Sequence, residues 1–206
     1  MNITVDISNV VLKTDRLVLR EWKESDLEDF FEYCSVDGVG QMAGWSPHEN
    51  IEKSKAILDL FIKEKKTFCI EFEGKAIGSV GIETYNENEF PEYANLKGRE
   101  IGFVLSKAYW GKGIMPEAVK AVIKYCFEDL GCDFLMCGHF VWNTQSKRVH
   151  KSADSTISKP LTTLQEWVRT NRRMRTCFSY RILKRKNNKQ TKRHLSRFPT
   201  RDSATK

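Results

Sequence analysis

Hydrophobic and polar positions in the first 150 residues predict alternating strands and helices. Apolar residues spaced three and four apart predict helices that begin near Ser25 and His48, and a third from Ala118 to Leu130. Short runs rich in β-branched and aromatic residues predict strands at 17–20, 67–72, 75–83, 100–105 and 134–141. The short Glu73-Gly74 connection indicates that the second and third of these strands form a hairpin.

The strand at 100–105 precedes the most informative segment, which reads Tyr109-Trp110-Gly111-Lys112-Gly113-Ile114-Met115-Pro116. Two glycines flanking a lysine let the backbone turn sharply and expose consecutive N–H groups, and proline suits the first turn of the following helix. A helix N-terminus carries about half a positive charge and unpaired donors. The segment therefore predicts a pyrophosphate site, to which Lys112 adds a full charge.

The glycine spacing excludes two common nucleotide-binding motifs. It fits neither the G-x-x-x-x-G-K-[ST] loop of nucleoside triphosphatases nor the G-x-G-x-x-G fingerprint of dinucleotide dehydrogenases. A tight turn without any ligand is the alternative interpretation of such a short glycine motif.

Composition agrees with one soluble domain. The chain has 206 residues, of which 40% are hydrophobic and 30% charged. No run reaches the length of a membrane span, and residues 1–10 lack the pattern of a signal peptide, so we expect a cytoplasmic protein with no membrane partner. The six cysteines, none in C-x-x-C spacing, are expected to be reduced core thiols, and no metal site is expected.

The net charge of +7 is divided unevenly along the chain. Residues 151–206 contain 16 lysines and arginines and 3 acidic residues, which gives +13, whereas residues 1–150 contain 18 and 24, which gives −6. The segment 151–206 also lacks clear periodicity, so we expect a basic, disordered tail. Such a tail is typical of an arm that binds nucleic acid, although it has no interleaved aromatic pattern.

The order E-I-G-F-V-L, Y-W-G-K-G-I-M, helix, strand and N-T-Q-S resembles the acetyl-CoA site of the GNAT superfamily of N-acetyltransferases. More narrowly, the chain resembles the ribosomal-protein-alanine N-acetyltransferase-like (RimJ/RimL-type) branch, whose beginning T-D-R-L-x-L-R-x-W is similar to residues 14–22. The resemblance implies an α/β (α+β) fold over residues 10–150, with a mixed, mainly antiparallel sheet flanked by helices and a parallel βαβ cofactor unit.

The resemblance also implies the activity and its site residues. An acetyl group would pass from acetyl-CoA to a primary amine, either a protein N-terminus or a small molecule, by direct attack in a ternary complex. Glu100 is the first choice for the base and Glu83 the second; the alternative for each is an ordinary strand carboxylate. The implied cofactor-binding residues are Val104, Leu105, Trp110, Gly111, Lys112, Gly113, Ile114, Met115, Asn143 and Ser146. Asn143 is otherwise a helix cap, and Tyr109 and Trp110 are expected to pack beneath the turn.

The resemblance stops near His150, because the family's following helix with a K-C-G-F-like turn and its two closing strands have no visible counterpart. One hypothesis is a frameshift: with permitted codons, reading Ser152-Ala153-Asp154-Ser155 one base earlier restores K-C-G-F. On this interpretation the closing strands are missing or altered and the activity is impaired. Nucleic-acid binding through residues 151–206 remains the alternative function, and the sequence does not predict the oligomeric state.

Overall fold

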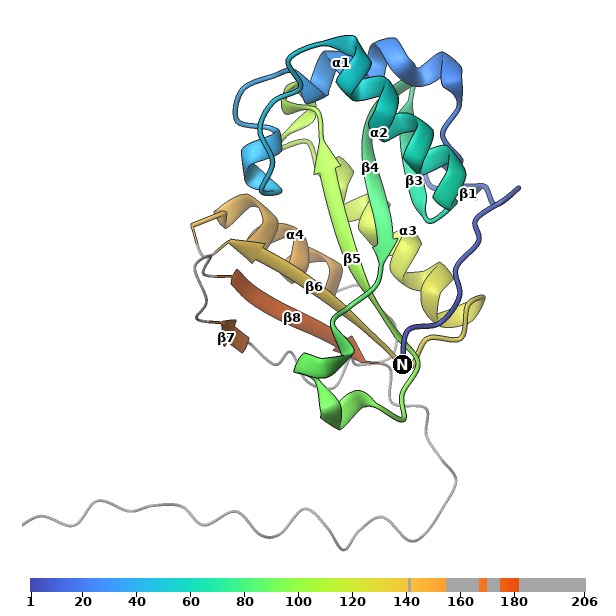
Figure 1. The fold of residues 1–206 in the computed structure, drawn as a ribbon, viewed down its shortest axis with the longest axis vertical. Coiled ribbons are helices and arrows are strands. Elements are labelled where there is room, and N and C mark those ends of the chain that lie inside the picture. Colours follow the sequence, from blue (N-terminus) through green and yellow to red (C-terminus); the bar gives the residue numbers. More distant parts are fainter. Residues whose placement is uncertain (141, 155–166, 170–174, 182–206) are drawn as a thin grey trace, which may run out of the picture.

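The computed structural model describes residues 1–140, 142–154, 167–169 and 175–181 (Figure 1). The strands are β1 (Leu12–Lys13), β2 (Val18–Arg20), β3 (Thr67–Phe72), β4 (Lys75–Glu83), β5 (Gly98–Leu105), β6 (Phe134–Phe140), β7 (Trp167–Arg169) and β8 (Arg175–Arg181). The α-helices are α1 (Leu27–Cys34), α2 (Ile51–Glu64), α3 (Ile114–Glu128) and α4 (Thr144–Asp154).

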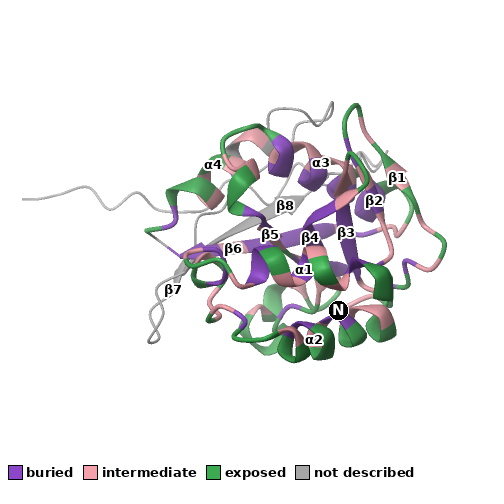
Figure 2. Ribbon diagram, turned by 90° about the horizontal axis from the view of Figure 1, so that it is seen from above, coloured by how far each residue is buried: buried purple, intermediate pink, exposed green. Residues whose placement is uncertain are grey.

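The described strands form one sheet in the order β1-β2-β3-β4-β5-β6-β8-β7. Neighbouring strands are antiparallel except β5 and β6, which are parallel and joined through α3. Helices α1 and α2 cover one face of the sheet, and α3 and α4 lie on the other (Figure 2). This arrangement confirms the mixed, mainly antiparallel α/β fold with one parallel βαβ unit.

The local pattern predicted most elements closely. The hairpin of β3 and β4 has the predicted bounds, and Asn50 caps α2 by accepting a hydrogen bond from the Lys53 amide at 2.9 Å. In α1 the structure buries Tyr33, whereas Phe31 is only half-buried, because the helix turns its 30–33–34 edge toward the sheet. A polar loop, 84–97, connects β4 to β5.

That loop also covers a small aromatic cluster. Tyr85 is buried, and Phe90, Tyr93 and Leu96 pack with it over Phe134 and Met136 of β6. The loop is therefore part of the fold at the point where β5 and β6 begin, and the acidic residues between its aromatic positions lie outside.

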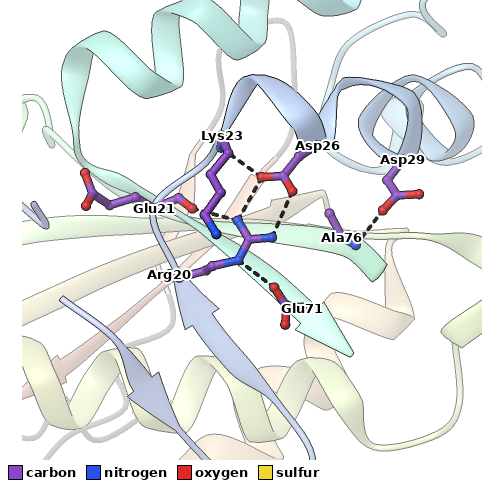
Figure 3. A network of polar contacts seen from close by, with 7 residues as sticks. All are labelled: Arg20, Glu21, Lys23, Asp26, Asp29, Glu71 and Ala76. Carbon is purple, nitrogen blue, oxygen red and sulfur yellow. Dashed lines mark hydrogen bonds and ion pairs between the residues drawn. The ribbon is translucent and has the colours of Figure 1, made fainter. Parts of the chain in front are cut away.

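Arg20 at the end of β2 organises a buried polar network (Figure 3). Its Nη1 and Nη2 atoms each donate to the Asp26 carboxylate at 2.8 Å, and its Nε donates to Glu71 at 2.6 Å. The Lys23 amide also donates to Asp26 at 2.8 Å. Hydrogen bonding to Asp26 raises the pKa of Arg20, so the guanidinium stays charged despite its burial. The network joins β2 to β3 and to the start of α1.

The structure differs from the sequence analysis beyond residue 151, where no strands were expected. β8 pairs antiparallel with β6 over its whole length, from Phe134 opposite Arg181 to Phe140 opposite Arg175, and β7 pairs with β8. The sequence C-F-S-Y within β8 does alternate between small and large residues, but four residues in a basic segment are a weak signal. The rest of the predicted basic tail lies outside the described residues.

The structure bears on two expectations from composition, one about the cysteines and one about membrane spans. Five cysteines are buried free thiols, namely Cys34, Cys69, Cys126, Cys132 and Cys137. Among the helices of the described residues, none has both the length and the apolar character needed to cross a bilayer.

Candidate active site

β5 and β6 separate part of the way along their length. Their parallel pairing covers only three positions and ends with Glu100 beside Met136. The Cys137 thiol donates to the Ile101 carbonyl at 2.9 Å just beyond this point. β5 continues to Leu105 in register with β4, while β6 follows β8. Within the described residues, the 102–105 edge of β5 that faces β6 therefore has no strand partner.

The turn after β5 has the conformation that its glycines predict. Gly111 and Gly113 have φ values of 76° and 75°, in the left-handed region where glycine is favoured. The Trp110 indole Nε1 donates to the Leu105 carbonyl at 2.8 Å, which fixes the turn to the end of β5. Tyr109 packs edge-on against Phe72. Both aromatic residues support the turn, as expected.

Helix α3 begins at Ile114, directly after Gly113. In the described part of the chain, no backbone amide from Gly111 to Met115 donates to another backbone carbonyl. The first such bond of this region runs from the Glu117 amide to the Gly113 carbonyl at 3.3 Å. Consecutive donors at a helix N-terminus are therefore available to an anion.

A cavity of about 410 Å³ lies between the separated end of β5, this turn and α4. Nine of the ten predicted cofactor-binding residues line it, namely Val104, Leu105, Trp110, Gly111, Gly113, Ile114, Met115, Asn143 and Ser146. Lys112 is absent from the lining, and its Nζ lies 5.2 Å from the centre of the Tyr109 ring. The positive contribution of the turn to the cavity thus comes from backbone dipoles more than from the lysine.

Asn143 connects two walls of the cavity. Its Oδ1 accepts from the Ser146 amide at 3.0 Å, which caps α4, and its Nδ2 donates to the Met42 carbonyl at 3.1 Å. Met42 belongs to the loop at 36–47 and lines the cavity, whereas Trp45 of the same loop packs against the core and the His48 ring. The capping interpretation of Asn143 is confirmed, and only part of the loop faces the cavity.

The two candidate bases lie opposite each other on β5 and β4. Glu100 pairs in register with Glu83, and neither residue lines the cavity. The Glu83 carboxylate forms an ion pair with Lys66 at 2.7 Å. Gly102, two residues beyond Glu100 on the same face, is exposed, and a Cβ built there meets no atom within 4 Å. Open space therefore separates Glu100 from the cavity-lining Val104.

A pair of histidines lies behind the cavity. His139 of β6 is buried, and its Nδ1 lies 2.7 Å from the Phe140 carbonyl oxygen, as expected of a core histidine. His150 of α4 stacks on it, with ring centres 5.3 Å apart, and also contacts the cavity-lining Phe103. Burial lowers the pKa of His150 to about 3, so this ring is neutral at physiological pH.

One group of residues beside the turn was not predicted from the sequence. Glu117 of α3 accepts from the Thr14 hydroxyl at 2.6 Å and from Arg16 Nε at 2.8 Å. Arg16 Nη1 also donates to the Lys112 carbonyl at 3.0 Å. Burial alone would raise the pKa of Glu117, but these hydrogen bonds lower it below its usual value. The T-D-R-L motif was the available signal, although it gave no hint of its partner about 100 residues away.

Comparisons with known proteins agree with this geometry. The structure is similar to a GNAT-family acetyltransferase from Bacillus anthracis, with TM-score 0.64 and 22% identity over 84% of this chain and 98% of that one. It is also similar to RimL, a ribosomal L7/L12 alpha-N-protein acetyltransferase, with TM-score 0.64 and 15% identity over 84% and 94% of the two chains. At these identities the similarity establishes the fold.

Sequence comparison identifies the family. The chain is 27% identical over 146 residues to YoaA, an uncharacterised N-acetyltransferase of Bacillus subtilis, which covers 68% of this chain and 78% of the relative. The family model for the acetyltransferase (GNAT) domain matches residues 16–156 and so includes both candidate carboxylates, the turn and all of α4. The chain therefore belongs to the GNAT family and is an acyltransferase enzyme.

Proposed function

We propose that this enzyme transfers the acetyl group of acetyl-CoA to a primary amine. The observation that carries the proposal is the cavity where β5 leaves β6, because it combines an unpaired strand edge with unpaired amides at the start of α3. An extended amide-containing arm fits the first feature and a diphosphate fits the second. Acetyl-CoA has both, and it supplies an acetyl group activated as a thioester.

The residues of the cavity have separate tasks in this proposal. The free edge of β5, beside Val104 and Leu105, binds the pantetheine arm as an added strand, and the amides from Gly111 to Met115 bind the diphosphate. Asn143 and Ser146 form the opposite wall at the start of α4. Holding the thioester beside the acceptor replaces a bimolecular encounter with a near-unimolecular step, so positioning supplies much of the rate.

We assign the role of base to Glu100. The acceptor must attack as a neutral amine, and its nitrogen loses a proton as the C–N bond forms and the C–S bond breaks. The open space beside Gly102 leaves room for an acceptor between Glu100 and the thioester end of the cavity. Glu83, whose carboxylate forms an ion pair with Lys66, is the alternative. The proton taken by the base is balanced by one that the departing thiolate acquires.

The acceptor class follows less directly from the fold. Similarity to RimL favours a protein N-terminus, and small-molecule amines are the alternative. An acetyl-transfer assay with N-terminal peptides, polyamines and free amino acids separates these classes. The five buried free thiols favour a reducing compartment such as the cytoplasm.

The matched pair Glu100→Gln and Glu83→Gln tests the assignment of the base. We expect Glu100→Gln to lower kcat/KM by about 10²- to 10⁴-fold and to leave the Kd for acetyl-CoA unchanged, because the carboxylate acts on the acceptor. Glu83→Gln is expected to retain most activity. The reverse result reassigns the base to Glu83, and a wild-type protein that acetylates none of the amines contradicts the proposed function.

We propose separately that the basic segment, residues 151–206, binds nucleic acid. Its net charge of +13 favours contacts with nucleic-acid phosphates, and such binding falls steeply with added salt. DNA retention measured at low and high salt, with and without residues 182–206, tests it. The coding DNA around codons 149–152 tests the frameshift hypothesis, because only certain third bases are compatible with the restored reading frame.

A further inference from the structure

We propose that Arg16 is a positioning residue for the diphosphate-binding turn, an inference that rests on the proposed function. Arg16 reaches the turn from the connection between β1 and β2, and its Nη1 donates to the Lys112 carbonyl at 3.0 Å. Lys112 lies between the two left-handed glycines and is absent from the cavity lining. The arginine therefore holds the middle of the turn from the side away from the cavity.

The Arg16 side chain is attached to a rigid support. The Thr14 amide donates to the Leu17 carbonyl at 3.0 Å, and the Leu17 amide donates to the Thr14 hydroxyl at 3.0 Å. Leu17 is 1% exposed and belongs to the core shared with α3. Because both ends of this short connection are fixed, the guanidinium reaches the turn at little further cost in conformational entropy.

Arg16 also neutralises a carboxylate beside the anion site. Glu117 lies in the first turn of α3, where its negative charge interacts well with the helix dipole but repels a bound diphosphate. Arg16 Nη2 lies 2.6 Å from Glu117 Oε2, and the Thr14 hydroxyl donates to Oε1. The same Nη2 is 3.6 Å from the position that a Cβ on Gly113 would occupy. One guanidinium thus joins the turn, the helix start and the opposing charge.

A purely structural role for the ion pair between Arg16 and Glu117 would have different consequences. The Arg16 and Glu117 side chains are 43% and 20% exposed, and pairs of this kind contribute little to folding. If Arg16 only supported the fold, its loss would change stability and cofactor affinity together, and removing Glu117 as well would not restore affinity. If it offsets the charge of Glu117, removing that charge restores part of the affinity that Arg16→Ala loses.

Calorimetric titration with acetyl-CoA distinguishes these roles. We expect Arg16→Ala to weaken binding about tenfold, which corresponds to one charged hydrogen bond and the uncompensated carboxylate. We expect the double variant Arg16→Ala/Glu117→Gln to bind acetyl-CoA about threefold more tightly than Arg16→Ala. Its thermal stability should be no higher than that of Arg16→Ala. The KM for acetyl-CoA should rise in proportion to Kd, while kcat at saturating acetyl-CoA stays within about twofold of wild type.

Lys55→Ala is the matched control, because Lys55 forms a comparable exposed ion pair with Asp59 on α2, away from the cavity. Its Kd should equal that of wild type. If Arg16→Ala binds acetyl-CoA as tightly as wild type, the inference is wrong and the proposed function still stands. A double variant that binds no better than Arg16→Ala leads to the same conclusion. If the wild-type protein does not bind acetyl-CoA, the proposed function is wrong, and so is the inference that rests on it.

Discussion

Two arginines of one short motif, Arg16 and Arg20, have contrasting surroundings. Arg20 is 12% exposed, and the Asp26 and Glu71 carboxylates bind it inside the fold. Arg16 is 43% exposed and contacts Glu117 and the backbone of the turn that borders the cavity. Both lie within residues 14–22, which resemble the beginning of the family. The motif thus combines a residue for stability with a residue that we assign to cofactor binding.

The contrast shows why residue type alone did not separate the two roles. Each arginine pairs with carboxylates at similar distances, so the local chemistry is the same. Burial and the position of the partner differ. Removing one member of a buried pair leaves an uncompensated charge, whereas removing an exposed member leaves a charge that water can solvate.

The largest predicted effect is on Arg20. We expect Arg20→Ala to lower the free energy of unfolding by about 3–5 kcal/mol, because Asp26 would remain buried without its partner. We expect Arg16→Ala to lower it by less than about 1 kcal/mol. Urea denaturation of both variants measures the difference. Equal losses would show that the two arginines have the same role.

The turn itself gives a second, smaller test. Gly113→Ala places a side chain at φ 75° and should cost about 1–2 kcal/mol of stability. Gly74→Ala in the β3–β4 turn is the matched control, because Gly74 has φ 80° and a Cβ there meets no atom within 4 Å, while the nearest atom to a Cβ at Gly113 is Arg16 Nη2 at 3.6 Å, an ordinary contact. Denaturation should give similar losses for the two variants, but calorimetry should show weaker acetyl-CoA binding only for Gly113→Ala. Weaker binding by both would point to a general effect of destabilisation.

The smallest predicted effect concerns Glu117 and pH. The pKa of Glu117 is lowered in the folded state, so its charge contributes stability above its unfolded pKa of about 4.3, and this contribution is lost as pH falls through the folded value. We expect Glu117→Gln to be less stable than wild type by under about 1 kcal/mol at pH 7 and equal to it at the acid end. Thermal unfolding from pH 7 to pH 3 measures this convergence. A difference that stays constant with pH contradicts the assigned ion pair.

Local patterns predicted the parts of the fold that depend on neighbouring residues. The β3–β4 hairpin, the turn at Gly111 and Gly113 and the cap at Asn143 are all set within a few positions. The separation of β5 from β6 depends on the register between distant strands, and the bond from Arg16 to Glu117 spans 101 positions. Neither leaves a periodic signal. The sequence therefore named ten cofactor-binding residues, of which nine line the cavity, but it missed the residues that hold the turn in place.

The central claim is that the amides between β5 and α3 bind the diphosphate of acetyl-CoA. Chemical shifts of ¹⁵N-glycine amides report on this directly, because Gly111 and Gly113 lie in the turn and Gly74 lies in a distant hairpin. Titration with acetyl-CoA should shift the first two resonances saturably and leave the Gly74 resonance in place. Unchanged Gly111 and Gly113 resonances at saturating acetyl-CoA would contradict the account.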